Sequence, residues 1–144
     1  MNSIIDYVDN LISTLSDNPA FSGYNFKKVY VVGDYDPVHN EFTAVFNIDE
    51  VKCSDSFISG LFRRNTLADI YKARLVIRLY GGNTVSGNSL TRSAVKLKKA
   101  VLQADSGGFI NSAVISPIKY ESKTGAVYRE LVFNIEYVLC EAVV

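Results

Sequence analysis

The sequence predicts an α+β fold: a mostly antiparallel β-sheet with two α-helices packed on one face. Two segments carry apolar residues at helical spacing, and several others alternate apolar with polar residues, as half-buried strands do. Glycine, proline or small polar residues stand at nearly every junction between these segments. At 144 residues, the chain is expected to form a single domain, residues 1–144, with a core of its own.

The first helix is expected between Ser3 and Asp17. Ser3 is a suitable N-cap, and Asp6 follows three residues later, as in a capping box. Pro19 stops the helix near Asn18. The apolar stripe predicted to face the core consists of Ile4, Ile5, Val8, Leu11, Ile12 and Leu15.

A β-hairpin is expected next. Residues 26–32 are rich in β-branched and aromatic side chains, and residues 42–48 alternate apolar with polar ones. Residues 34–40, with the sequence DYDPVHN, are typical of a turn and favour antiparallel pairing of the two strands. The acidic residues near this turn do not have the spacing of a calcium loop, so a solvated hairpin end is favoured over the alternative of a weak cation site.

Residues 50–69 fit neither the helical nor the strand period, and two interpretations stay open. The segment is either a long irregular loop, of a kind that is usually functional or mobile, or a weak extended hairpin with turns near residues 54–56 and 64–66. Arginine lies beside aromatic residues here, a combination typical of protein interfaces. A loop folded back on its own domain is an equal alternative. The candidate contact residues in this segment are Phe57, Leu61, Phe62, Arg63 and Arg64.

The strand expected at residues 72–80 alternates strictly, which predicts one covered and one polar face. The side predicted to face the core carries Ala73, Leu75, Ile77 and Leu79. The opposite side carries Lys72, Arg74, Arg78 and Tyr80, with Val76 as the apolar exception. Arg74 and Arg78 complete the candidate oligomer or partner interface.

One more helix and two more strands complete the predicted fold. The helix is capped by Ser89, ends at Gly107-Gly108, and buries a stripe of Leu90, Ala94, Leu97, Val101 and Ala104. A strand at residues 109–120 contains Pro117, which indicates a sheet edge or a bulge. A hairpin turn ending at Gly125 leads into the last, long strand, whose core-facing residues are Val127, Leu131, Phe133, Ile135, Tyr137 and Leu139.

No pattern in the chain predicts catalysis, a cofactor or a bound metal. His39 is the only histidine and lies in the predicted turn, far from any nucleophile motif. The glycine loop at residues 81–87 lacks the ending of a phosphate-binding loop. Cys53 and Cys140 match no metal spacing and are interpreted as two unlinked thiols.

The overall charge and hydropathy restrict the partners. Fifteen basic and fifteen acidic residues give a formal net charge of zero, which argues against specific nucleic-acid binding and makes self-association easier. No apolar run approaches the length of a bilayer span, so no membrane partner is expected. The first residues include an acid and lack the basic region of a signal peptide, which favours a cytoplasmic protein.

The order of elements and the sequence around the second helix resemble the phage tail-terminator, or tail-completion, family. The resemblance is carried by ISGLF at residues 58–62, ARLVIRLY at 73–80, the loop to Gly87, the helix at 90–104, and YRELVFNIEY at 128–137. These segments cover about half of the chain and match in apolar spacing and order rather than in chemical motifs.

The resemblance implies a structural protein without enzymatic activity or cofactor. Such a subunit forms a ring, usually a hexamer, on the last ring of a tail tube, stops tube growth and offers a surface to a head connector or cap. The expected partners are further copies of the chain, the tail tube protein, and also sheath and head-connector proteins. The expected location is the cytoplasm of the host or producer cell during assembly, and then the virion or phage-tail-like particle.

Two other functions are weighed beside this one. The first is a baseplate- or sheath-associated adaptor of the same particle. The second is a small-ligand-binding or enzymatic α+β domain that uses the polar sheet face, with a pocket lined by Tyr30, Arg74, Arg78 and Tyr80.

Overall fold

The computed structural model describes residues 3–28, 42–59, 66–82, 86–123 and 125–142. For residues 54–59, 66–69 and 139–142 it describes the backbone alone. Four of the candidate contact residues (Leu61, Phe62, Arg63 and Arg64), together with Tyr30 and His39, lie outside the described residues.

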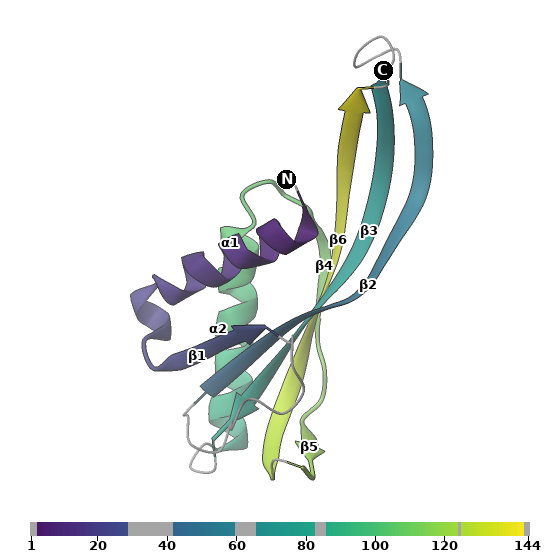
Figure 1. The fold of residues 1–144 in the computed structure, drawn as a ribbon. Helices are drawn as coiled ribbons and strands as arrows, with labels where there is room; N and C mark the ends of the chain where they lie inside the picture. Colours follow the sequence, from purple (N-terminus) through teal and green to yellow (C-terminus); the bar gives the residue numbers. More distant parts are fainter. Residues whose placement is uncertain (1–2, 29–41, 60–65, 83–85, 124, 143–144) are drawn as a thin grey trace.

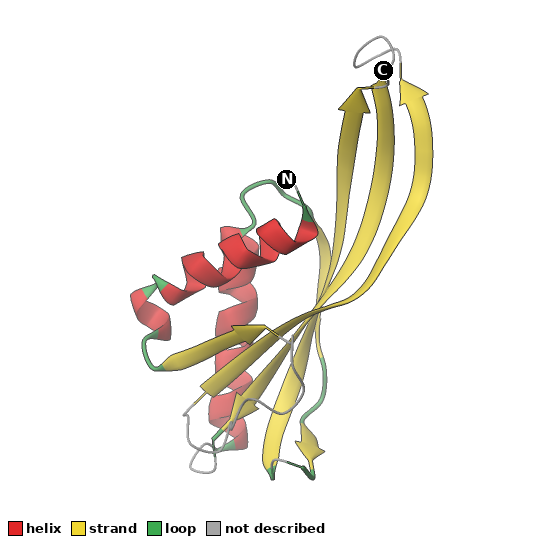
Figure 2. Cartoon of the chain, viewed as in Figure 1, coloured by secondary structure: helices red, strands yellow, loops and turns green. Residues whose placement is uncertain are grey.

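A six-stranded sheet and two helices make up the described chain, which confirms the predicted α+β class. The elements, in order, are α1 (Ile4–Ser16), the 3-10 turn η1 (Pro19–Phe21), β1 (Tyr24–Lys28), β2 (Phe42–Ser59), β3 (Thr66–Gly81), α2 (Gly87–Ala104), β4 (Ile110–Ile115), β5 (Lys119–Glu121) and β6 (Ala126–Ala142). The sheet order is β1-β2-β3-β6-β4, and β5 pairs with β6. All pairs are antiparallel except β1–β2. Both helices cover one face of the sheet (Figure 1, Figure 2).

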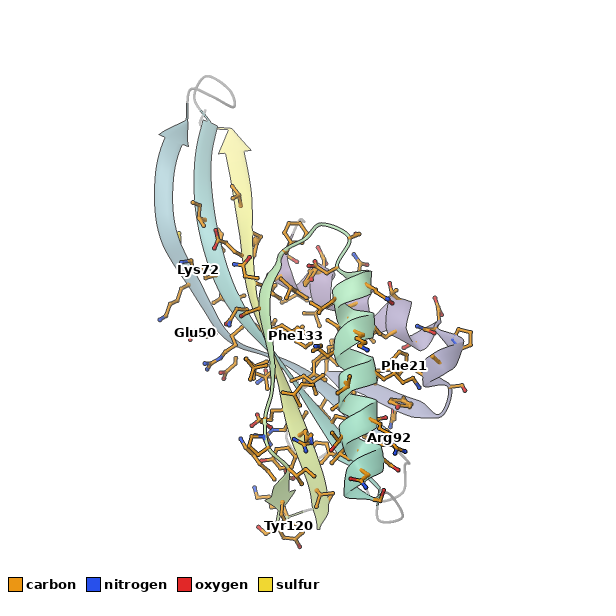
Figure 3. The ribbon with its side chains drawn as sticks, turned by 180° about the vertical axis from the view of Figure 1, so that it is seen from behind. Phe21, Glu50, Lys72, Arg92, Tyr120 and Phe133 are labelled. Carbon is orange, nitrogen blue, oxygen red and sulfur yellow. The ribbon has the colours of Figure 1, made fainter. Side chains whose placement is uncertain are left out.

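The core lies between the two helices and the part of the sheet that they cover. This part is drawn at the bottom of Figure 1, and we call it the lower half. The predicted strand residues Leu75, Ile77 and Leu79 are fully buried, and the predicted α2 stripe meets them from the other side. Phe133 of β6 lies at the centre of this layer (Figure 3). Each such side chain contributes about 1.5–3 kcal/mol by leaving water. The fully buried α2 residues are Leu90, Ala94, Leu97 and Val101.

Of the two predicted helix N-caps, one is confirmed and one is wrong. The Ser3 side chain accepts a hydrogen bond from the Asp6 amide at 3.0 Å, so the α1 cap is as predicted. The α2 cap is Ser86 and not Ser89: the Ser86 hydroxyl accepts from the Ser89 amide at 3.1 Å. The helix therefore begins earlier, and Ser89 lies in its first turn.

The predicted hairpin between the first two strands is wrong. β1 and β2 are parallel neighbours, with Tyr24 beside Phe42 and Lys28 beside Phe46. A parallel pair needs a crossover of about a dozen residues or more, and residues 29–41 supply that length. The turn residues between the two strands reflect only local preferences of the chain. The direction in which β1 and β2 pair depends on the rest of the sheet.

In the described residues 50–59 and 66–69 the chain forms paired strands, as the extended-hairpin interpretation predicted, and not an irregular loop; the predicted turn near residues 64–66 falls mostly outside the described residues. β2 continues to Ser59 and β3 begins at Thr66, with sixteen residues of β3 paired continuously to β6. The predicted turn at residues 54–56 is absent from this described stretch, where β2 runs on through register shifts at Ile48/Glu50 and Cys53/Asp55. A bulge inserts one residue and reverses the alternation, which explains why no regular period was visible.

Two single-residue predictions also fail. Ile5 was assigned to the core but is 57% exposed on α1. Tyr80 was assigned to a polar face but is fully buried with Val45 and Ala126 in a second, small apolar cluster against Tyr128. The face of the sheet away from the helices is therefore polar only in part.

The predicted strand at residues 109–120 is interrupted. β4 ends at Ile115 and β5 begins at Lys119, so Pro117 lies in the break, and β4 is an edge strand as Pro117 indicated. Arg129 of β6 holds this break in place, because its guanidinium donates to the Ser116 carbonyl at 2.6 Å and to the Thr91 hydroxyl of α2 at 3.0 Å.

Candidate assembly surface

Three strands of the sheet continue past the helices and form a projection, which we call the arm. The arm consists of β2 from Lys52 to Ser59, β3 from Thr66 to Lys72 and β6 from Glu136 to Ala142. Figures 1 and 2 show it rising beyond the end of α1, with no helix on either face. Phe57, one of the candidate contact residues, lies in the arm opposite Ala68 of β3.

Both edges of the arm are open among the residues that the structure describes. β1 pairs with β2 only from Phe42 to Phe46, and β4 pairs with β6 only from Leu131 to Ile135. The Glu136 amide donates a hydrogen bond to the Phe109 carbonyl at 2.9 Å. Among the described residues, this is the last bond on the β4 side of β6 before the arm. An exposed strand edge is a template for another strand.

The two edge strands of the arm run in the same direction. β2 and β6 are each antiparallel to the central β3 and are therefore parallel to each other. If the edge of β2 in one copy met the edge of β6 in another with both arms pointing the same way, the new ladder would be parallel. That contact is head-to-tail, and repeated head-to-tail contacts close into rings when the rotation between copies allows.

At the base of the arm, apolar side chains lie on both faces of the sheet. Tyr71 and Tyr137 stack with ring centroids 5.3 Å apart, and Tyr137 is buried. Burial raises the pKa of the Tyr137 hydroxyl. Val138, the next residue, lies on the opposite face, away from the helices, and is 47% exposed, whereas Val51 of β2 lies on the helical face with its partner Ala73 and is 46% exposed.

Arg74 and Arg78, the two candidate contact residues on the polar face, are engaged within the chain. Arg74 pairs with Asp49 of β2. Arg78 pairs with Glu121 at 3.4 Å and Glu130 at 3.5 Å, and its guanidinium lies 4.9 Å from the centre of the Tyr128 ring. The two arginines are four residues apart on one strand, roughly 13 Å. They do not form a single site with each other or with Phe57.

The cluster around Arg78 is well connected. Tyr80 donates a hydrogen bond to Glu121 at 2.7 Å, and Lys119 pairs with Glu130 at 2.7 Å. A hydrogen bond with Tyr80 raises the pKa of Arg78 above its usual value. Burial opposes ionisation of Glu130, but the hydrogen bond from Lys119 and the nearby cations prevail and lower its pKa.

The small-ligand pocket that the sequence suggested on this face is not formed by the described residues. Tyr80 is buried beneath the Arg78 cluster. A shallow pocket of about 260 Å³ does border Arg74, together with Lys72, Asn134 and Glu136, but Arg78 and Tyr80 do not line it. The predicted residues therefore lie in two different environments.

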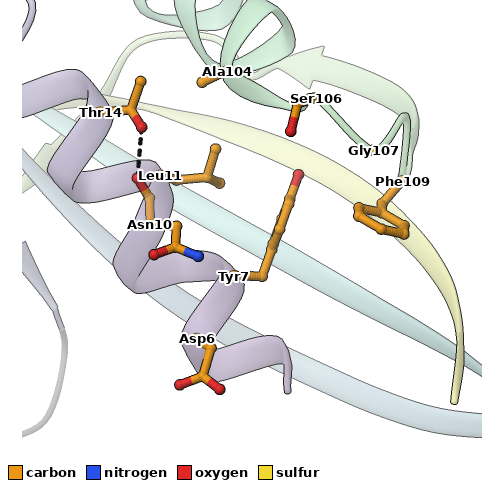
Figure 4. Close-up of a pocket in the computed structure, with 9 residues that line it drawn as sticks. All are labelled: Asp6, Tyr7, Asn10, Leu11, Thr14, Ala104, Ser106, Gly107 and Phe109. Carbon is orange, nitrogen blue, oxygen red and sulfur yellow. Dashed lines mark hydrogen bonds between the residues drawn. The ribbon is translucent and has the colours of Figure 1, made fainter. Parts of the chain in front are cut away.

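A second pocket, of about 380 Å³, lies between α1 and the loop that follows α2 (Figure 4). Tyr7 crosses this pocket and donates a hydrogen bond to Asp105 at 2.7 Å. The Asp105 carboxylate also accepts the amides of Phe109 at 3.2 Å and Ile110 at 2.9 Å. Burial and the bond to Asp105 raise the pKa of Tyr7 far above its usual range. These polar groups serve as a joint between α1, α2 and β4, and no nucleophile lies beside a base here.

The sequence pattern could not have located the arm edges, since they depend on how far β1 and β4 extend along their neighbours. Within the described part of the chain, no three metal-ligating side chains come together, and no helix has the length and hydropathy needed to cross a membrane. No family model matches this sequence, and no curated protein is similar enough to it to count as a relative.

Proposed function

We propose that this protein is a structural assembly subunit that forms a ring, with six copies expected, at the end of a phage-type tail tube. The ring stops growth of the tube and presents a docking surface to a head connector or cap. The number of copies and the identity of the tube come from the resemblance of the sequence to tail terminators. The observation that supports assembly most strongly is the arm, with two open edges that run in the same direction.

We expect the arm to be less stable in a single copy than in an assembly. Three strands without a covering layer bury little apolar surface, and isolated β ribbons are marginally stable in water. Pairing β2 with β6 of the neighbour would satisfy edge amides and carbonyls and would place side chains of the added strand beside Val51 and Val138. The zero net charge of the chain adds little repulsion between copies.

The polar face supports assembly over a small-ligand function. Arg74 and Arg78 already have carboxylate partners in their own chain, so they are not available to clamp a small anion without breaking those pairs. Their role is to stiffen the strands from which the arm projects.

The first experiment measures assembly of the purified full chain by sedimentation velocity and its binding to purified tail tubes by electron microscopy. We expect a defined ring that decorates one end of the tube and stops further polymerisation of tube protein. A strict monomer that leaves tube growth unchanged would contradict the proposal. Decoration of a baseplate or sheath with bare tube ends would indicate the adaptor function instead.

A proline substitution tests the edge itself. The amides of Glu130 and Glu136 both point to the β4 side of β6, to Ser116 and Phe109, and alternation places the Val138 amide on that same outer side. Val138→Pro removes this outward amide without removing a bond to β3, whereas Val138→Thr keeps it. We expect the proline variant to fold and fail to form rings, and the threonine variant to assemble. Normal rings from the proline variant would exclude this edge.

A further inference from the structure

A groove of about 550 Å³ lies along α2 beside η1, on the helical layer and far from the arm. Its apolar part includes Phe21, Val95 and Ala100, and its rim carries Arg92, Lys96 and Lys99. Figure 3 shows Phe21 and Arg92 beside the same flank of α2, on two different elements. The groove therefore combines an apolar floor with three positive charges.

The rim cations lack carboxylate partners among the described residues. The Lys96 ammonium lies 4.8 Å from the centre of the Phe21 ring and 5.2 Å from that of Tyr24, and it donates to the Ala20 carbonyl. The described ion pairs involve neither Arg92 nor Lys99. A complementary occupant would bring an apolar side chain flanked by carboxylates.

The first turn of α1 has that character. Ile5 is 57% exposed, which is unusual for an isoleucine on a helix that packs on a core. Asp6 follows it and has no cationic partner among the described residues, whereas Asp9, one turn further along, pairs with Lys28 of its own chain. Helices α1 and α2 also differ in charge, because α1 has no lysine or arginine and α2 has no acid.

The groove cannot be filled by the Ile5 of its own chain. The groove borders η1, which follows the C-terminal end of α1, whereas Ile5 stands at the N-terminal end. At 1.5 Å per residue, these two ends are roughly 16 Å apart along a rigid helix. A contact between them must therefore join two copies.

We propose that the α2 groove receives the first turn of α1 from a second copy of this chain, with Ile5 against Val95 and Ala100, and Asp6 near Arg92 and Lys99. The first turn of α1 and the α2 groove are different surfaces, so the contact is head-to-tail, the kind that builds rings. The inference deepens the proposed function and rests on it for the ring. It adds a second, electrostatic contact to that of the arm edges.

Charge reversal tests the contact, because two opposite reversals are each expected to weaken it and, when combined, to restore it. One variant carries Asp6→Lys, and the other carries Arg92→Glu with Lys99→Glu. We expect each alone to weaken self-association about tenfold or more, because like charges then meet across the contact. An equimolar mixture of the two should recover association in alternating copies, and so should one chain that carries all three changes. Ile5→Ser should weaken association without rescue by either.

The matched control is Lys98→Glu with Lys123→Glu, which changes net charge equally but lies outside the groove. We expect it to associate as the unaltered chain does, and we expect association in about 50 mM salt to weaken at high salt. Sedimentation equilibrium measures all variants, with circular dichroism as a check on folding. Association of the single variants at unaltered strength, or folded variants whose mixture shows no recovery, would overturn the contact.

The two proposals fail separately. If reversal variants still form rings but Val138→Pro does not, the arm edges alone build the ring and the groove has no role in it. If the charge rescue succeeds but no ring binds a tube end, the contact between copies stands and the tail function falls. Binding of a DNA duplex that is lost on reversal of Arg92 and Lys99 would assign the groove to phosphates and overturn the inference.

Discussion

The lower and upper halves of the central strands belong to one sheet but differ in their surroundings. In the lower half, Leu75, Ile77 and Leu131 are fully buried because α1 and α2 cover them. In the upper half, β2, β3 and β6 continue with no helix on either face, and Val51 and Val138 are exposed on opposite faces where this half begins. The difference indicates that the lower half stabilises the subunit, whereas in the proposed assembly the upper half would gain stability from a neighbouring copy.

The largest contrast between the halves is expected from truncating one side chain in each. Leu97→Ala removes a fully buried leucine of α2 and should lower the free energy of unfolding by about 2–5 kcal/mol. Val138→Ala in the arm should change that of the monomer by about 0.5 kcal/mol or less. Urea unfolding measures both. Equal losses would show that the arm belongs to the core of the monomer.

A smaller difference in stability is expected between two variants that each lose one tyrosine hydroxyl. Tyr7→Phe removes the hydroxyl that donates to the Asp105 carboxylate, and hydrogen bonds to charged groups contribute about 1.5–3 kcal/mol. Tyr137→Phe keeps the stack on Tyr71 and should be nearly neutral, since no hydrogen bond joins the Tyr137 hydroxyl to another described residue. Thermal unfolding of both variants compares the joint of the helical layer with the base of the arm. A loss confined to Tyr137→Phe would reverse the assignment.

The smallest expected effect concerns pH and the polar face of the lower half. The folded state lowers the pKa of Glu130, so its contribution is present above the unfolded pKa of about 4.3 and is lost as pH falls below it. The free energy of unfolding should therefore decrease between about pH 5 and pH 3, and Glu130→Gln should make that decrease shallower. Urea unfolding at a series of pH values measures the slope. An unchanged slope would mean that Glu130 does not contribute to acid sensitivity.

Local patterns in the sequence predicted the lower half well. The stripe around Leu97 and the alternation around Leu75 follow directly from helical and strand periods, and Ser3 caps its helix as its chemistry suggests. The failures have physical reasons. Bulges near Glu50 and Asp55 reversed the strand period, and the turn residues before Phe42 could not show that β1 would pair in parallel.

The candidate surface was harder to predict than the fold. Arginine beside phenylalanine drew attention to residues 57–64, and Phe57 does lie in the arm, while residues 60–65 lie outside the described chain. Arg74 and Arg78 were predicted as contact residues, but their carboxylate partners come from β2, β5 and β6, which no local pattern reveals. The exposure of Ile5 likewise depends on where the helix meets the sheet, and not on its spacing in the sequence.

Amide hydrogen exchange, resolved by peptide and compared between monomer and assembled ring, tests the central claim most directly. We expect residues 47–59 and 136–142 to exchange quickly in the monomer and to become protected in the ring, because their open edges then pair with neighbours. Residues 73–80, beneath the helices, should be protected in both states. Equal exchange of the arm peptides in monomer and ring would contradict the claim that the arm edges build the assembly.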